Sequence, residues 1–110
     1  MIVLNVGGQK FETSVETLTM RYGFFKNLIE SFHGSEREFF IDRDGTYFRH
    51  ILNYLRGSHY LPPNSAILKQ LRIEADFYSL NEMISLIDWE LKKGVRTIEE
   101  ELNCISSRIG

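Results

Sequence analysis

The chain opens with alternating side chains. Ile2, Leu4 and Val6 are apolar and are separated by single residues, and an extended pattern resumes at Lys10 after two glycines. Alternation with a period of two is typical of a β-strand with one buried face. A pair of glycines accepts the positive φ angles that tight hairpin turns require. We therefore expect a β-hairpin over about the first twelve residues.

Two helices are predicted next. Thr13 to Glu16 fits a capping box, in which the threonine hydroxyl and the glutamate carboxylate each bond a free backbone N–H, and a short helix follows to about Met20. From Gly23 onward, apolar residues recur at spacings of one, three and four, which line one broad face of a helix. Gly34 is placed to end this second helix.

A short strand and a third helix follow. The apolar run from Phe39 to Ile41 predicts a buried strand. Asp44 is expected to cap a helix from Gly45 to Arg56, and Gly57 stands where a left-handed residue would close it. The inner face of this helix is predicted to carry Phe48, Ile51, Leu52 and Leu55, and its outer face Arg49, His50, Asn53 and Arg56.

The rest of the domain is predicted to be helical. Residues 58–61 could form one short edge strand, since the two prolines that follow forbid a central ladder. Asn64 or Ser65 then caps a fourth helix. Residues 79–82 form a second capping box, and an apolar stripe follows it to near Gly94.

The tail carries a narrower pattern. Its apolar residues are separated by three, four, three and four positions, a heptad seam that suits helix-to-helix association. Only two heptads are present, so a tail helix packed on its own domain stays open as an alternative. We divide the chain into a domain at residues 1–94 and a helical extension at residues 95–110. The seam consists of Val95, Ile98, Leu102, Ile105 and Ile109.

Composition narrows the function. A chain of 110 residues is the size of one domain. Its net charge of −2 offers no basic field, so nucleic acid is not expected as a partner. A single cysteine and the absence of an Asn-x-Ser/Thr acceptor predict a cytoplasmic or nuclear location. No apolar run approaches the roughly 20 residues that cross a bilayer, so no membrane insertion is expected.

No set of residues predicts catalysis. Asp42 and Asp44 are the nearest carboxylate pair, but Arg37, Arg43 and Arg49 could keep both ionised, which argues for capping and ion pairs. The histidines and the cysteine lack the spacing of a metal site. We therefore expect no catalytic residue, no metal and no cofactor. The residues considered for a metal site were His33, His50, His59 and Cys104.

Two features have no role in the predicted core: the outer face of the predicted third helix and the acidic end of the strand before it. Charges of both signs on one face can be a solvated surface. They can equally be self-complementary, so that the acids of one copy meet the arginines of the next. The sequence pattern leaves these two interpretations open.

Three motifs carry a resemblance to a known family. They are L-N-V-G-G-x-x-F-x-T-S-x-x-T-L from Leu4, F-I-D-R-D-G-x-x-F-R-x-I-L-N-Y-L-R from Phe40 and E-A-x-F-Y-x-L from Glu74. Together they resemble the BTB/POZ domain of the potassium-channel-tetramerisation type, and most nearly the KCTD proteins. The resemblance covers about residues 2 to 92, and Gly45 stands where the family often has proline.

The resemblance implies a fold and a role. The fold is α/β (α+β), with a small mixed three-stranded sheet, surrounding helices and a C-terminal helix. The role is non-catalytic self-assembly into a tetramer or pentamer, with a cullin-based ubiquitin ligase as a further partner; the alternative is a purely structural module such as the cytosolic tetramerisation domain of a channel. The implied subunit-interface residues are Asn5, Gln9, Asp42, Arg43, Asp44, Arg49 and Asn53, and the candidates for binding the third cullin are Phe77 and Tyr78.

Overall fold

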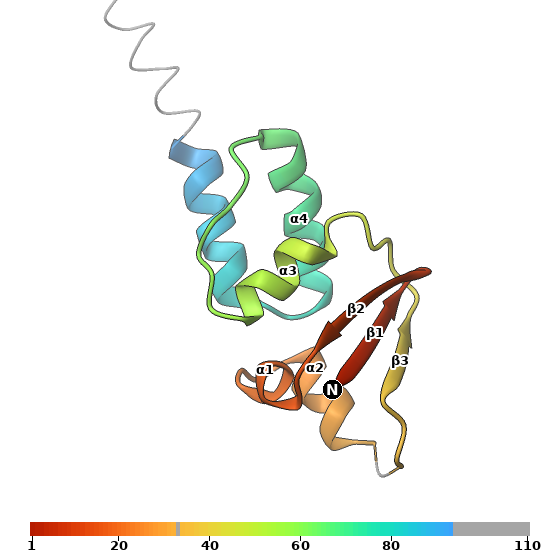
Figure 1. Cartoon of the computed structure of the whole chain (residues 1–110). Coiled ribbons are helices and arrows are strands. Elements are labelled where there is room, and N and C mark those ends of the chain that lie inside the picture. Colours follow the sequence, from red (N-terminus) through yellow and green to blue (C-terminus); the bar gives the residue numbers. More distant parts are fainter. Residues whose placement is uncertain (33, 94–110) are drawn as a thin grey trace, which may run out of the picture.

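The computed structural model describes residues 1–32 and 34–93. The strands are β1 (Ile2–Val6), β2 (Gln9–Thr13) and β3 (Glu38–Ile41). The helices are α1 (Val15–Thr19), α2 (Phe24–Glu30), α3 (Phe48–Leu55), α4 (Ser65–Phe77) and a further helix at residues 81–93 (Figure 1). The predicted tail helix with its seam, Gly94, His33 and Cys104 lie outside the described residues.

The three strands form one mixed sheet in the order β2-β1-β3. β1 and β2 are antiparallel and Val6 pairs with Gln9, which confirms the predicted hairpin. Its two-residue turn has positive φ angles, 57° at Gly7 and 102° at Gly8, as a tight hairpin requires. β3 returns parallel to β1, with Asn5 opposite Phe40, so the mixed three-stranded sheet is confirmed.

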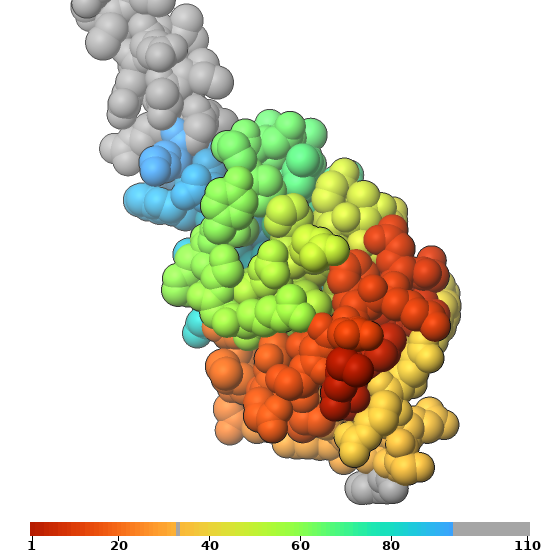
Figure 2. Space-filling model, viewed as in Figure 1, coloured from red at the N-terminus to blue at the C-terminus, as the bar shows by residue number. Residues whose placement is uncertain are grey.

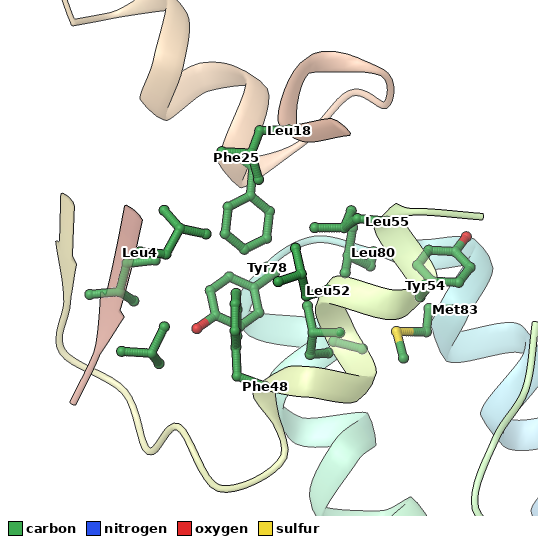
Figure 3. Close-up of a cluster of buried hydrophobic side chains, with 14 of the residues drawn as sticks. Leu4, Leu18, Phe25, Phe48, Leu52, Tyr54, Leu55, Tyr78, Leu80 and Met83 are labelled. Atoms are coloured by element: carbon green, nitrogen blue, oxygen red, sulfur yellow. The ribbon is translucent and has the colours of Figure 1, made fainter. Parts of the chain in front are cut away.

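One face of the sheet and the helices share a single core. Alternate residues of β1 and β3 point inward because successive strand side chains alternate between the two faces. α3 buries Tyr54 in addition to its four predicted apolar residues. Figure 3 shows the resulting cluster, to which the strands, α1, α2, α3 and the helix at 81–93 contribute side chains and in which the ring of Tyr78 lies beside Phe25 and Phe48. In the described part of the chain, no helix has the length and apolar character needed to span a membrane.

The starts of α1 and α3 differ from the prediction. Ser14, not Thr13, caps α1 by accepting from Thr17 N, because Thr13 is still the last residue of β2. α3 begins at Phe48, three residues later than predicted. Asp44 instead accepts hydrogen bonds within the preceding turn, from Thr46 N at 2.9 Å. The predicted caps of α1 and α3 are therefore wrong.

Three further predictions are wrong in whole or in part. α2 ends at Glu30 with Ser31 as its C-cap, so Gly34 does not end the helix. β3 is buried on one side only: Phe40 is 65% exposed, because helices cover one face of this edge strand and not the other. Residues 58–61 form no strand.

The ends of α3 and α4 share one backbone motif. After α3, Gly57 N donates to Tyr54 O and Ser58 N to Asn53 O, the Schellman pattern, with the predicted left-handed glycine at φ 103°. α4 starts at the predicted cap Asn64, whose side chain accepts from Ile67 N. It ends with the same pattern. The bonds run from Ser79 N to Asp76 O and from Leu80 N to Ala75 O, both near 3 Å.

Ser79 is therefore a helix terminator and not the N-terminal residue of a capping box. Its φ is 57°, and it is the one non-glycine residue with positive φ in the described chain. A left-handed conformation is unfavourable for residues with a Cβ, and glycine is usual at this position.

We expect Ser79→Gly to raise the free energy of unfolding by about 0.5 to 1 kcal/mol, because glycine removes the left-handed strain. Urea unfolding at a fixed protomer concentration measures this change. Ser79→Ala is the control, since alanine keeps the Cβ and should leave stability near that of the wild type. A glycine variant no more stable than the alanine variant would contradict this account of the turn.

Candidate protein-interaction surfaces

None of the helices at the described residues covers the outer face of the sheet. Asn5 lies at its centre, with Phe40 of β3 on one side and Lys10 of β2 on the other, in register. Phe40 is 65% exposed, and Lys10 Nζ lies 3.2 Å from Glu38 Oε1. In Figure 2 the red and yellow atoms of the strands reach the molecular surface. This face combines one large apolar side chain with polar and charged neighbours.

The loop after β3 is fixed against the hairpin turn. Gly7 N donates to Ile41 O at 3.0 Å, and a Cβ on Gly7 would overlap the carbonyl oxygen of Arg43. A Cβ on Gly45 would lie 2.6 Å from Val6 O. Only glycine allows backbones to approach this closely. The approach also brings the loop at residues 42–46 against Gln9. A Cβ added to Gly45 would lie 3.2 Å from the Gln9 Cβ.

The two predicted loop acids are exposed and make no ion pair with an arginine among the residues that the structure describes. The expected pairing with Arg37, Arg43 and Arg49 is therefore wrong within one protomer. The Thr46 hydroxyl, and then its backbone N–H, donate to Asp44 and hold its pKa below the ordinary value. The negative charge of the two loop acids is thus left to solvent or to another molecule. Over the described ranges, no three His, Cys, Asp or Glu side chains group as metal ligands.

The outward row of α3 lies beside β2. Arg56 Nη2 donates to Glu12 O at 2.7 Å, which ties the end of the helix to the strand. Arg49 is exposed and Asn53 half-buried in the same row. A shallow groove of about 230 Å³ separates this row from β2. Its lining residues are Lys10, Phe11, Glu12, Arg49, Leu52 and Arg56.

Arg43 differs from the other predicted interface residues. Its side chain leaves the loop and reaches α4, where Nε and Nη2 donate to Glu74 Oε2 at 3.0 and 2.6 Å. Its guanidinium carbon lies 4.3 Å from the ring centroid of Phe77. Phe77 is 42% exposed and so forms part of a second surface, on α4. The role of Glu74 could not be read from the sequence, because only the folded chain brings it to Arg43.

Tyr78 is a core residue. It is 1% exposed, and its ring lies 4.8 Å from that of Phe25 and 5.6 Å from that of Phe48 (Figure 3). Its position does not support the predicted direct contact with a cullin. Its hydroxyl is buried and has no hydrogen-bond partner among the residues that the structure describes. Tyr78 instead supports Phe77, whose ring centroid lies 5.0 Å away.

Comparison with known proteins gives the same family as the motifs. The sequence model of the BTB/POZ domain matches residues 2–87. BTB/POZ domain-containing protein KCTD21 of Homo sapiens is 39% identical over an alignment 110 positions long, which covers 94% of this chain and 41% of the relative. FH protein interacting protein FIP2 of Arabidopsis thaliana is 37% identical over 96% of this chain and 37% of its own length.

A third relative extends the comparison. Potassium channel regulatory protein of Bos taurus is 34% identical over 96% of this chain and 42% of its own length. The chain thus spans about two fifths of the length of these relatives. The family match at residues 2–87 covers the three strands, α1 to α4 and both candidate surfaces.

We expect Tyr78→Phe to leave the free energy of unfolding at neutral pH unchanged or to raise it by up to about 1 kcal/mol, because the buried hydroxyl has no partner. Burial raises the pKa of Tyr78 above its ordinary value of 10.0. The unfolded chain therefore loses this proton first, so stability falls as pH rises above about 10, by at most about 1.4 kcal/mol per pH unit.

The phenylalanine variant should show a shallower loss of stability above that pH, measured by urea unfolding between neutral and alkaline pH. Tyr22→Phe, at a side chain that is 87% exposed, is the control and should follow the wild type. A large loss of stability at neutral pH in Tyr78→Phe would show that the hydroxyl has a bonding partner.

Proposed function

Because the chain belongs to the BTB/POZ domain family of the potassium-channel-tetramerisation type, we propose that it is a self-assembling adaptor which presents several copies of itself to a cullin-based ubiquitin ligase. Self-association is the first half of this proposal and the cullin contact the second. One observation carries it. Within residues 1–32 and 34–93, no helix covers the outer sheet face, and neither the loop acids at one end of it nor Arg49 beside β2 makes an ion pair.

Self-association would satisfy these groups. Asp42 of one copy can meet Arg49 of the next, since neither makes an ion pair in its own described protomer. Two different surfaces that complement each other give a head-to-tail contact, which closes into a ring when the rotation fits. We propose a tetramer or pentamer, with Asn5, Gln9, Asp44 and Asn53 as further contacts.

Phe40 adds the apolar part of this interface. Burying a phenylalanine side chain is favourable by about 1.5 to 3 kcal/mol, whereas an exposed ion pair contributes about 0.2 to 1 kcal/mol. The charged residues therefore mainly set register and partner choice, and Phe40 supplies much of the affinity. The sequence pattern does not identify this residue as an interface residue, because an apolar run predicts burial inside one protomer.

The adaptor role is assigned to the α4 surface around Phe77. A half-exposed aromatic side chain on a rigid helix is a typical anchor in protein interfaces. On a ring, several such anchors act together, and linked sites can raise avidity by about 10² to 10⁴ without new contacts. We place this non-catalytic module, without a cofactor, in the cytoplasm or nucleus.

A purely structural assembly module is the second candidate. It is favoured by the relative whose name is potassium channel regulatory protein. In that case the subunits would assemble through the same sheet face and α3 row, and the α4 surface would bind no cullin. The two candidates therefore differ in one measurable property.

For self-association, we expect Arg49→Glu and Asp42→Arg each to weaken assembly by at least about tenfold, because like charges would then face each other across the interface. The double variant should recover part of the affinity. Light scattering and sedimentation over a range of concentrations measure the change. Lys69→Glu, at an exposed position on α4, is the control. A wild type of one-chain mass at every concentration rules the assembly out.

For the adaptor role, we expect the protein to retain the N-terminal part of the third cullin in a pull-down and Phe77→Ala to abolish this binding. Assembly should stay intact, since Phe77 lies outside the self-association surface. Tyr60→Ala removes an aromatic side chain that is 70% exposed in a loop and serves as the matched control. No binding by the wild type would leave the structural module as the function.

A further inference from the structure

The side chain of Arg43 joins the two surfaces inside one protomer. We infer that Arg43 is a positioning residue for Phe77, held by Glu74, and not the subunit contact that the motif predicts. Its effect on partner binding rests on the proposed adaptor function. Its effect on the Phe77 ring does not.

The main chain at Arg43 is fixed by the hairpin. Arg43 N donates to Ile41 O at 2.9 Å, and the Arg43 carbonyl packs against the Cα of Gly7, where a Cβ would not fit. The starting point of the side chain is therefore rigid. From there the guanidinium extends to α4, and only 28% of the side chain stays exposed.

Glu74 sets the plane of the guanidinium. Nε and Nη2 both donate to the same oxygen, Glu74 Oε2, and the Glu74 side chain is only 13% exposed. Charge-assisted hydrogen bonds of this kind are strong, and a planar guanidinium stacks well on an aromatic ring. Glu74 and Phe77 are three residues apart on α4, so both lie on the same helix face. One guanidinium can therefore bond the first and cover the second.

The ring of Phe77 is held on its other sides by aromatic neighbours. Its centroid lies 5.4 Å from that of Phe24 and 5.0 Å from that of Tyr78. With Arg43 at 4.3 Å, three side chains confine a ring that is still 42% exposed. A confined anchor loses less rotamer freedom on binding than a mobile one. This saving corresponds to about a 2- to 12-fold gain in affinity.

The contrast with Arg49 supports this role. Arg49 is exposed and makes no ion pair with any described residue, as expected of a side chain that awaits another molecule. The donors Nε and Nη2 of Arg43 are already satisfied by Glu74. Breaking that pair to reach a neighbouring subunit would leave the largely buried Glu74 carboxylate unpaired, which is costly.

The test uses two variants. Arg43→Lys keeps the positive charge but loses the planar guanidinium, and Glu74→Gln keeps the size of the side chain but weakens its hydrogen bonds with Arg43. We expect both variants to assemble with wild-type mass in light scattering and to bind the N-terminal part of the third cullin about 2- to 12-fold more weakly. Arg72→Lys is the matched control, because Arg72 on α4 makes the same kind of pair, at 2.6 Å, with Asp88 of the helix at residues 81–93. It should bind as the wild type does.

A second readout does not depend on the cullin. The ring current of Phe77 should shift the Arg43 side-chain proton resonances upfield in the wild type, and Phe77→Leu should remove this shift. Glu74→Gln should reduce it. Loss of assembly in Arg43→Lys, with unchanged Phe77 ring resonances, would overturn the inference and restore Arg43 as a subunit contact. If the wild type binds no cullin, the adaptor role fails, and the resonances alone decide the positioning role.

Discussion

The close approach between the hairpin turn and the loop after β3 is the constraint on which both surfaces depend. Two backbones meet there at distances that only Gly7 and Gly45 permit. This contact places Gly45 of the loop against Gln9 and sets the starting point of the Arg43 side chain. Small shifts at this point would move the self-association surface and the α4 surface together, since both are built on the same few backbone atoms.

The two faces of the sheet show how a small domain can have a core and an interface from the same strands. Alternate residues of β1 and β3 enter the core, and those between them face outward. A chain of this size has few helices with which to cover a sheet, and here they cover one face (Figure 1). Phe40 on the open face is then an exposed apolar group, which is common at sites where another protein binds.

The sequence predicted most of the local structure because local signals determine it. Alternation determined the hairpin, a glycine determined the end of α3, and Asn64 the start of α4. The misses depend on tertiary contacts. Phe40 has the same apolar character as a core residue, and only strand pairing shows which face it takes. Tyr78 and Phe77 are adjacent in the sequence, yet one is buried and the other half-exposed. The Arg43 partner is 31 residues away along the chain.

Arg43 and Arg49 illustrate why residue type and motif position do not settle a role. Both are arginines in one motif, and both were assigned to the same interface. The carbonyl packed on Gly7 directs one side chain toward α4, where a largely buried carboxylate neutralises it. The other projects from α3, where no described residue pairs with it. A buried pair is costly to separate, whereas an exposed cation is free to meet an acid on another molecule. The location of each carboxylate partner, within the protomer or beyond it, therefore separates a positioning role from a contact role.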